Sequence, residues 1–156
     1  MLTSRLVRDW AAAAALLGLR FALALPFYRS GLTKWDGFLH LSDSAVYLFT
    51  EEFRLHLFGH EVPYPFPATV ALLSGCAEVA LSLLVLVGLG TRLAALGLLG
   101  MTAIIQLTVP DGWLTYHLPW AAMALTLAAF GPGPLSLDRA LRQPFQRLRE
   151  SLLPAH

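Results

Sequence analysis

Charge and cysteine are both scarce in this sequence. Asp, Glu, Lys and Arg make up 13% of the 156 residues, whereas about 25% is usual for a soluble domain. The formal net charge of +1 gives no reason to expect a nucleic acid partner. The lone Cys76 excludes an internal disulfide, a CxxC redox pair and a cysteine-rich metal site. Redox chemistry in this protein would therefore need another group.

Apolar residues are what the chain has in excess. They make up 56% of the sequence, and the mean hydropathy is +0.61. One small core cannot hide that much apolar surface, so the lipid bilayer is the expected solvent. No stretch alternates between polar and apolar residues for long enough to indicate a strand. The sequence therefore predicts an all-α membrane protein.

A helix that spans a membrane needs about 20 mostly apolar residues. Stretches that meet or approach this length cover about 10–32, 68–90, 93–109 and 117–131. We therefore predict a four-helix transmembrane bundle in residues 1–135. A cleaved secretory signal is the alternative for the first stretch, but Arg20 and the apolar run beyond it favour a retained helix.

The distribution of Lys and Arg predicts the orientation, because cytoplasmic loops are enriched in both. With four spans, both termini lie on one side together with Arg5, Arg8, Arg92, Arg139, Arg142, Arg147 and Arg149. The other side has Arg29, Lys34 and Arg54. We expect a multi-pass protein of a bacterial-type inner membrane, with cytoplasmic termini and an extracytoplasmic loop over 34–67.

Two segments outside the spans show apolar residues at helical spacing. Residues 44–58, after a cap at Ser42 or Asp43, predict a short amphipathic surface helix. Residues 136–156 form a basic amphipathic cytoplasmic tail that suits an interfacial helix on anionic lipid. A solvated basic tail is the alternative for this second segment.

Arg20 and Glu78 are charges near the middle of the first two predicted spans. Such a charge costs at least about 2.5–3.5 kcal/mol at mid-membrane, so neither side chain is expected to face lipid. The two helices are consecutive and antiparallel, and we expect the residues to lie at similar depth and to pair. The pair is either a buried ion pair that only holds the two helices in register or the catalytic candidate of the chain.

A second cluster is expected toward the outer leaflet. Arg29, Gln106, His117 and Trp120 would offer hydrogen-bond donors and a flat aromatic ring, which suit a quinone head group. The alternative is an ordinary interfacial belt of aromatic and cationic side chains. His56 and His60 have helical ligand spacing, but Gly59 interrupts the helix, so we predict no metal site.

Several short motifs resemble the DoxX-type (DoxX/DoxD-like) integral membrane protein family. They are Arg20 with the run Arg29-Ser30-Gly31-Leu32-Thr33-Lys34, then Glu78, then the turn Gly88-Leu89-Gly90-Thr91-Arg92. The resemblance covers about 17–137 and implies a four-helix membrane bundle. Some members of this family are described as subunits of quinone-linked oxidoreductases, such as thiosulfate:quinone oxidoreductase, and others are linked to thiol-redox complexes. The resemblance therefore also implies a redox role. The last part of the chain resembles a subgroup encoded beside enzymes that make modified, copper-binding peptides.

Two functional hypotheses follow. In the first, the protein is the membrane subunit of a quinone-linked redox complex, an oxidoreductase component that acts only with a partner protein. In the second, it is a non-catalytic accessory or scaffold protein that handles or matures a small metal-binding peptide or another cargo. Both place the chain in the lipid bilayer with a redox or biosynthetic partner protein. Neither needs a covalent cofactor, and only the first needs quinone.

Overall fold

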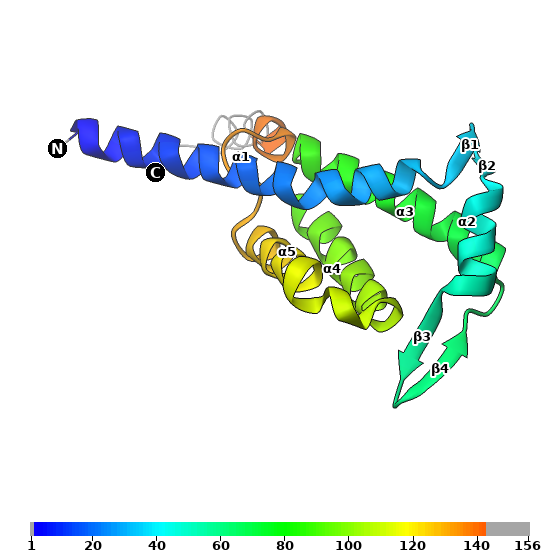
Figure 1. The fold of residues 1–156 in the computed structure, drawn as a ribbon. Coiled ribbons are helices and arrows are strands. Elements are labelled where there is room, and N and C mark those ends of the chain that lie inside the picture. Colours follow the sequence, from blue (N-terminus) through cyan, green and yellow to red (C-terminus); the bar gives the residue numbers. More distant parts are fainter. Residues whose placement is uncertain (1, 143–156) are drawn as a thin grey trace, which may run out of the picture.

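The structure is a set of helices with two small hairpins at one end (Figure 1). The computed structural model describes residues 2–142 of the chain, and the side chains of residues 7–142. The elements are α1 (Leu2–Leu32), β1 (Trp35–Gly37), β2 (His40–Leu41), α2 (Asp43–Tyr47), β3 (Arg54–Leu57), β4 (His60–Pro63), α3 (Pro67–Val87), α4 (Thr91–Thr108) and α5 (Leu118–Phe130).

Three helices are long and apolar enough to cross a membrane. They are Val7–Leu32 within α1, Pro67–Val87 and Thr91–Thr108, and they coincide with the first three predicted spans to within a few residues. Gly88 (φ +74°) and Gly90 (φ +55°) make the turn between the last two, in a left-handed conformation that glycine adopts without steric cost.

The fourth predicted span corresponds to α5, which has 13 residues and is shorter than a membrane crossing requires. A single π-helical turn, Trp113–His117, leads directly into it. Helices α1, α3, α4 and α5 pack in a ring in which each contacts two neighbours, α1 with α3 and α5, and α4 with α3 and α5. The core of this ring consists of Leu23, Ala24, Phe27, Val85, Ala94, Ala95, Leu98, Ala124 and Leu127.

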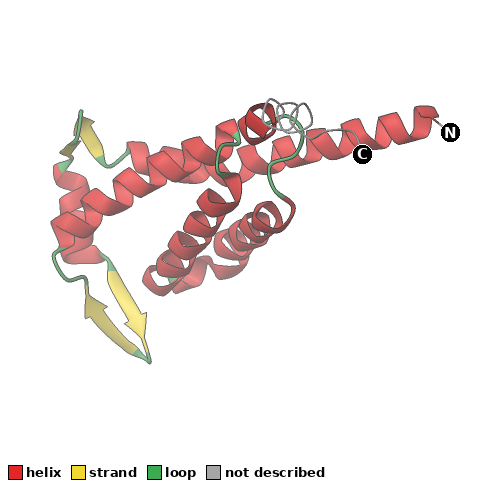
Figure 2. Ribbon diagram, turned by 180° about the vertical axis from the view of Figure 1, so that it is seen from behind, coloured by secondary structure: helices red, strands yellow, loops and turns green. Residues whose placement is uncertain are grey.

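The expectation that the chain has no strands is wrong. Two antiparallel two-stranded hairpins, β1–β2 and β3–β4, flank α2 at the end of the helices opposite the N-terminus (Figure 2). The second hairpin turns at Phe58 and Gly59, both with positive φ. Each strand has four residues or fewer, and alternation over so few residues gives no clear period in a sequence.

The predicted surface helix over 44–58 is therefore half right. Of the two predicted candidates, Ser42 and not Asp43 is its N-cap, because the Oγ of Ser42 accepts a hydrogen bond of 3.2 Å from the N–H of Ala45. The helix continues through a π-helical turn at Leu48–Glu52 and then ends, since residues 54–57 pair with residues 60–63.

Close approach of α1 and α3 depends on glycine. A Cβ on Gly31 would lie 2.8 Å from Cγ2 of Val79 and 3.0 Å from Cβ of Glu78. By contrast, a Cβ on Gly18 of the same helix would meet nothing within 4 Å. The two glycines of α1 thus differ, and at Gly31 the α1 backbone lies close against α3.

The loop after α5 is tied to the α3–α4 turn by Asp138. Its N–H donates to the carbonyl of Gly88 (2.8 Å), and its carboxylate accepts from the N–H of Gly90 (2.8 Å) and of Thr91 (3.1 Å). Burial raises the pKa of Asp138, but hydrogen bonds from Thr91 and Gly90, together with the charge of Arg142, outweigh it. The pKa of Asp138 therefore lies below its usual value. Residues 137–142 are helical, and the remainder of the predicted tail, 143–156, lies outside the described residues.

Substitution Gly31→Ala should destabilise the protein, whereas Gly18→Ala should not. Alanine favours a helix at both positions by about 1 kcal/mol, but at Gly31 overpacking against α3 opposes this gain by about 1–3 kcal/mol. The measurement is the thermal unfolding midpoint of each variant in mild detergent. Equal midpoints for the two variants would contradict the close approach at Gly31.

Substitution Asp138→Ala should cost about 1–2 kcal/mol at pH 7, because the N-terminus of α4 loses its cap. A carboxyl whose pKa is lowered on folding adds stability above its unfolded pKa and loses it as the pH falls through its folded pKa. The stability difference between the two proteins should therefore shrink as the pH falls below about 4. Unfolding midpoints measured from pH 7 to pH 3 test this, and a constant difference would refute it.

Candidate functional site

Glu78 forms a buried ion pair with Lys34. Its Oε2 lies 2.6 Å from Nζ of Lys34, and both side chains are largely buried. The hydroxyl of Ser74 donates to the other carboxylate oxygen, Oε1, at 3.1 Å. The ammonium of Lys34 also contacts the carbonyl and the hydroxyl of Ser30, at 3.3 and 3.2 Å. All four of these side chains therefore belong to one hydrogen-bonded group.

The end of α1 positions Lys34 over α3. Lys34 follows the last residue of the helix by two positions, and its N–H donates to the carbonyl of Gly31 at 3.2 Å. Its aliphatic stem and the ring of Trp35 lie against Gly75, where a Cβ would be 3.3 Å from Cδ of Lys34 and 2.9 Å from Cζ2 of Trp35. The absence of a side chain at Gly75 lets the ammonium reach Glu78.

The expected pair between Arg20 and Glu78 is wrong. Arg20 is buried, but its guanidinium donates to backbone carbonyls. Its Nε lies 2.9 Å from the carbonyl oxygen of Val85. The other accepting carbonyls belong to Leu86, Pro132 and Leu135. Arg20 therefore joins α1 to the last turn of α3 and to the loop that follows α5.

The register of the two helices explains the different partners. Gly31 lies against Glu78, whereas the guanidinium of Arg20 reaches the carbonyl of Val85. Arg20 and Gly31 are 11 residues apart on α1, which is about 16 Å along a helix axis. Arg20 and Glu78 are central in their own spans but lie at different depths, since α1 runs past the end of α3 (Figure 1).

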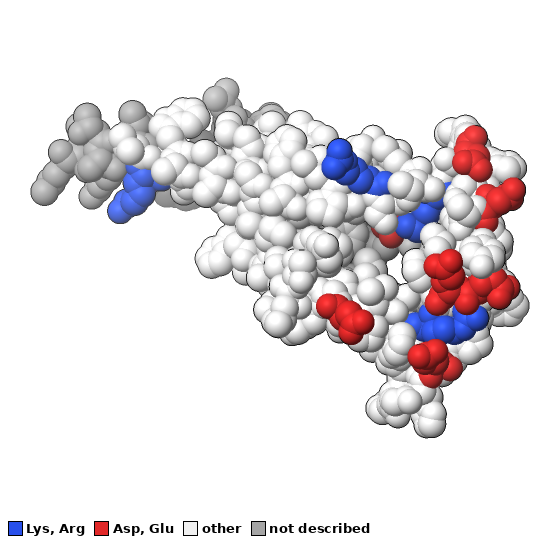
Figure 3. Space-filling model, viewed as in Figure 1, with Lys and Arg blue, Asp and Glu red and all other residues white. Residues whose placement is uncertain are grey.

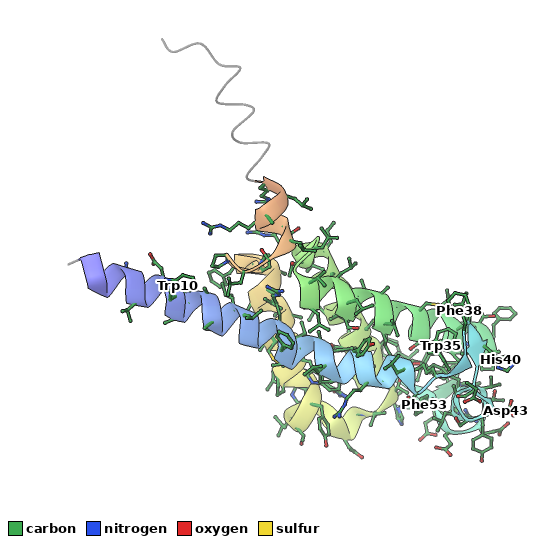
Figure 4. All side chains as sticks on the ribbon, turned by 90° about the horizontal axis from the view of Figure 1, so that it is seen from above. Trp10, Trp35, Phe38, His40, Asp43 and Phe53 are labelled. Carbon is green, nitrogen blue, oxygen red and sulfur yellow. The ribbon has the colours of Figure 1, made fainter. Side chains whose placement is uncertain are left out.

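A cavity of about 410 Å³ lies beside the ion pair. Lys34, Glu78, Ser30 and Ser74 line one part of it, and the rest is largely apolar. The apolar lining comes from α1, α3, α4, α5 and the segment between α1 and α3, and it includes Phe27, Phe53, Ala77, Ile105 and Trp120. Figure 4 shows Phe53 near Trp35 at the hairpin end of the molecule, far from Trp10 on the projecting part of α1.

Two of the residues that line the cavity are exposed on the outer surface of the helices. Leu73 of α3 and Ile104 of α4 line it and are 62% and 52% exposed. Both residues lie within helices that are apolar enough to cross a membrane. In a bilayer, the cavity therefore opens toward lipid.

Of the four residues predicted to bind quinone, the structure brings three together. Nδ1 of His117 lies 2.6 Å from Oε1 of Gln106, so Nδ1 carries the proton. The imidazole also packs on Trp120, with ring centroids 5.6 Å apart. His117 is buried, and a Cβ on Gly112 would lie only 2.6 Å from its Cε1. Arg29 is exposed and makes no hydrogen bond to a side chain among the described residues.

Trp120 alone of these four lines the cavity. Its ring packs on Phe27 of α1, at 5.0 Å between centroids, and on His117, which Gln106 in turn holds by a hydrogen bond. Sequence reasoning missed Lys34, which it treated as a loop cation. The available signal was its position just past a span end, from where a long side chain can reach back along the helix.

His56 and His60 lie in the β3–β4 hairpin. Nε2 of His56 is 3.6 Å from Glu61, and its Nδ1 is 3.1 Å from the carbonyl oxygen of Leu107. Across residues 2–142, no three His, Cys, Asp or Glu side chains gather in a way that could hold a metal ion.

Most of these site residues lie in the part of the chain that matches the model of one protein family. The family model described as DoxX matches residues 15–111. The match includes Arg20, Lys34, Glu78 and Gln106 and stops before His117. Neither a curated protein nor a solved structure matches the chain.

A double-mutant cycle should show that Glu78 is coupled to Lys34 and not to Arg20. Lys34→Met and Glu78→Gln should each cost about 3 kcal/mol or more, because each leaves a buried charge without its partner. The double variant should cost clearly less than the sum. By contrast, Arg20→Gln and Glu78→Gln should add to within about 0.5 kcal/mol. The measurement is the free energy of unfolding in mixed micelles, and coupling between Arg20 and Glu78 would contradict this assignment.

Proposed function

The chain is a membrane protein of the DoxX family, and from this premise we propose that it is the membrane subunit of a quinone-linked redox complex. The observation that carries the proposal is the cavity beside Lys34 and Glu78. A mostly apolar pocket with a few convergent polar groups is the usual form of a small-molecule site. This one opens toward the lipid, where quinones dissolve.

The residues of the cavity fit a quinone. Its volume of about 410 Å³ lies within the range of about 300–1,000 Å³ of ligand sites. Trp120 and Phe27 offer aromatic surfaces to a flat ring. Leu73 and Ile104 line the cavity and are exposed on apolar helices, which suits an apolar tail that extends into the bilayer. When bound, a quinone supplies the capacity to accept two electrons and two protons.

The side chains of this protein bind and orient the ligand. The ammonium of Lys34 donates a hydrogen bond to a carbonyl of the ring in place of one of its longer contacts to Ser30, and Glu78 holds Lys34 at the cavity wall. Lys34 Nζ is also the proton donor on the cavity wall. Gln106 and His117 act indirectly, since they fix the ring of Trp120. The electrons come from a partner protein, because a chain with one cysteine cannot ligate an iron–sulfur cluster alone.

We also propose that α5 is the fourth span, with the π-helical turn before it completing the crossing. Residues 113–130 form 18 continuous helical residues, which extend about 27 Å. Four spans place both termini on one side. Acidic side chains gather at the hairpin end (Figure 3), and they include Asp36, Asp43, Glu51, Glu52 and Glu61. Arg8, Arg92, Arg139 and Arg142 lie at the other end, and Arg29, Lys34 and Arg54 lie toward the hairpins. The larger number of basic residues at the first of these ends supports cytoplasmic termini in a bacterial-type inner membrane.

The hairpins favour a second candidate, a non-catalytic accessory protein. Phe38 and Phe58 are fully exposed at the two hairpin tips, and such aromatic side chains are enriched at protein interfaces. A surface of this kind suits a partner or a peptide cargo, and it serves either candidate function. Occupancy of the cavity by quinone distinguishes the two.

Filling the cavity should abolish quinone binding. Ala77 lines it, whereas Ala80, one turn further along α3, is exposed and does not. In Ala77→Phe the larger ring occupies ligand space, so binding of decylubiquinone should fall at least tenfold. Ala80→Phe is the matched control and should bind like the native protein. The measurement is quenching of tryptophan fluorescence on titration with the quinone in detergent.

Three results bear on the choice of function. Equal binding by Ala77→Phe and Ala80→Phe would show that the quinone does not bind in this cavity. No binding by the native protein would favour the accessory role. Quinone that co-purifies with the native protein and is lost from Ala77→Phe, with both proteins folded to the same yield, would support the redox role.

A further inference from the structure

A second hollow lies at the opposite end of the bundle from the quinone cavity. It measures about 750 Å³ and lies between the start of α4, the end of α5 and the helical segment 137–142. Figure 1 shows that segment, in orange, beside the end of α3. The hollow is lined by three arginines, Arg92, Arg139 and Arg142, and by one carboxylate, that of Asp138.

Asp138 offsets only part of the positive charge of the hollow, because it is one carboxylate among three arginines. Both oxygens accept hydrogen bonds from the first residues of α4, Oδ1 from Gly90 and Oδ2 from the N–H and hydroxyl of Thr91. The N-terminus of α4 is thereby capped within the chain. Three guanidinium groups and one carboxylate leave the hollow with an excess of positive charge.

The walls of the hollow are held in place from both sides. Asp138 ties the segment 137–142 to the α3–α4 turn, and Arg20 donates to the carbonyls of Pro132 and Leu135 in the connecting loop. The guanidinium of Arg92 lies close to the backbone of Gly131, where a Cβ would be 3.5 Å from its Nε. Arg92 therefore lies beside the loop that Arg20 and Asp138 hold in place.

Two large apolar side chains line the same hollow. Leu93 and Phe130 are 77% and 75% exposed, and they lie next to the arginines. Thr91 is the first residue of a helix able to span a membrane, so the hollow lies at the depth where lipid phosphates are found. A ligand that fits it has an anionic head and an apolar body.

We propose that this hollow binds the phosphate head group of an anionic phospholipid. Guanidinium groups bind phosphate oxygens in a bidentate manner. The positive charge of a choline head group would oppose binding next to the arginines. Leu93 and Phe130 contact the acyl chains, which a free phosphate lacks. Basic pockets of this kind at the cytoplasmic ends of spans are typical of lipid head-group sites. The proposal is independent of quinone binding, since the two sites share no lining residue.

The test compares ligands on the purified full-length protein in detergent. Short-chain phosphatidylglycerol should raise the unfolding midpoint in a saturable manner, whereas phosphatidylcholine of the same chain length should not. Inorganic phosphate at the same concentration should have little effect. An equal shift with phosphatidylcholine would overturn the proposal, and an equal shift with phosphate would assign the site to a free anion.

The variants locate the effect. Arg92→Gln/Arg139→Gln should weaken the response to phosphatidylglycerol at least tenfold in concentration, because two charge-assisted contacts to phosphate are lost. Arg8→Gln is the matched control, since Arg8 lies on the projecting part of α1 and does not line the hollow. It should respond like the native protein. The same loss in both proteins would mean diffuse attraction by net charge, and no loss in the double variant would place the lipid elsewhere.

Discussion

The close contact between α1 and α3 at Gly31 is the constraint on which the rest of the structure depends. The absence of a side chain there lets the α1 backbone lie against Glu78 and Val79. Once this contact is made, the antiparallel register follows along both helices. Lys34 then reaches Glu78 at one end, and Arg20 reaches the carbonyl of Val85 at the other. Small residues at such contacts are the usual means of packing helices in a membrane, where no hydrophobic force drives the helices together.

The two buried charges of the spans are stabilised in different ways. Glu78 has a cation and a hydroxyl as partners, and its group borders a cavity that opens toward lipid. Arg20 is satisfied by backbone carbonyls alone among the described residues, and it fastens the loop after α5 to the end of α3. The first arrangement leaves an ion pair within reach of a ligand. The second uses the donors of Arg20 to hold the fold, so Arg20 acts as a positioning residue.

The ends of the bundle offer different chemistry. The hairpin end combines an apolar cavity with one ion pair and an excess of acidic loop residues, and the other end presents arginines around a preformed hollow. In the proposed orientation the end with the arginines is the cytoplasmic one. A lipid held at one end and a quinone at the other would use the same four helices as a common frame.

The sequence by itself determined the features that depend on composition and local pattern: the membrane environment, the long apolar helices, the cap at Ser42 and the DoxX family. It also pointed to Arg20, Glu78 and Trp120 as side chains with an unusual setting. It could not determine their partners, because those depend on the register between helices. That register is set by contacts distant in sequence, and nothing local distinguishes Gly31, which touches α3, from Gly18, which touches nothing. The tertiary structure alone decided that Lys34 is the partner of Glu78 and that a cavity lies beside this ion pair. It also decided that short strands form where the sequence shows no period.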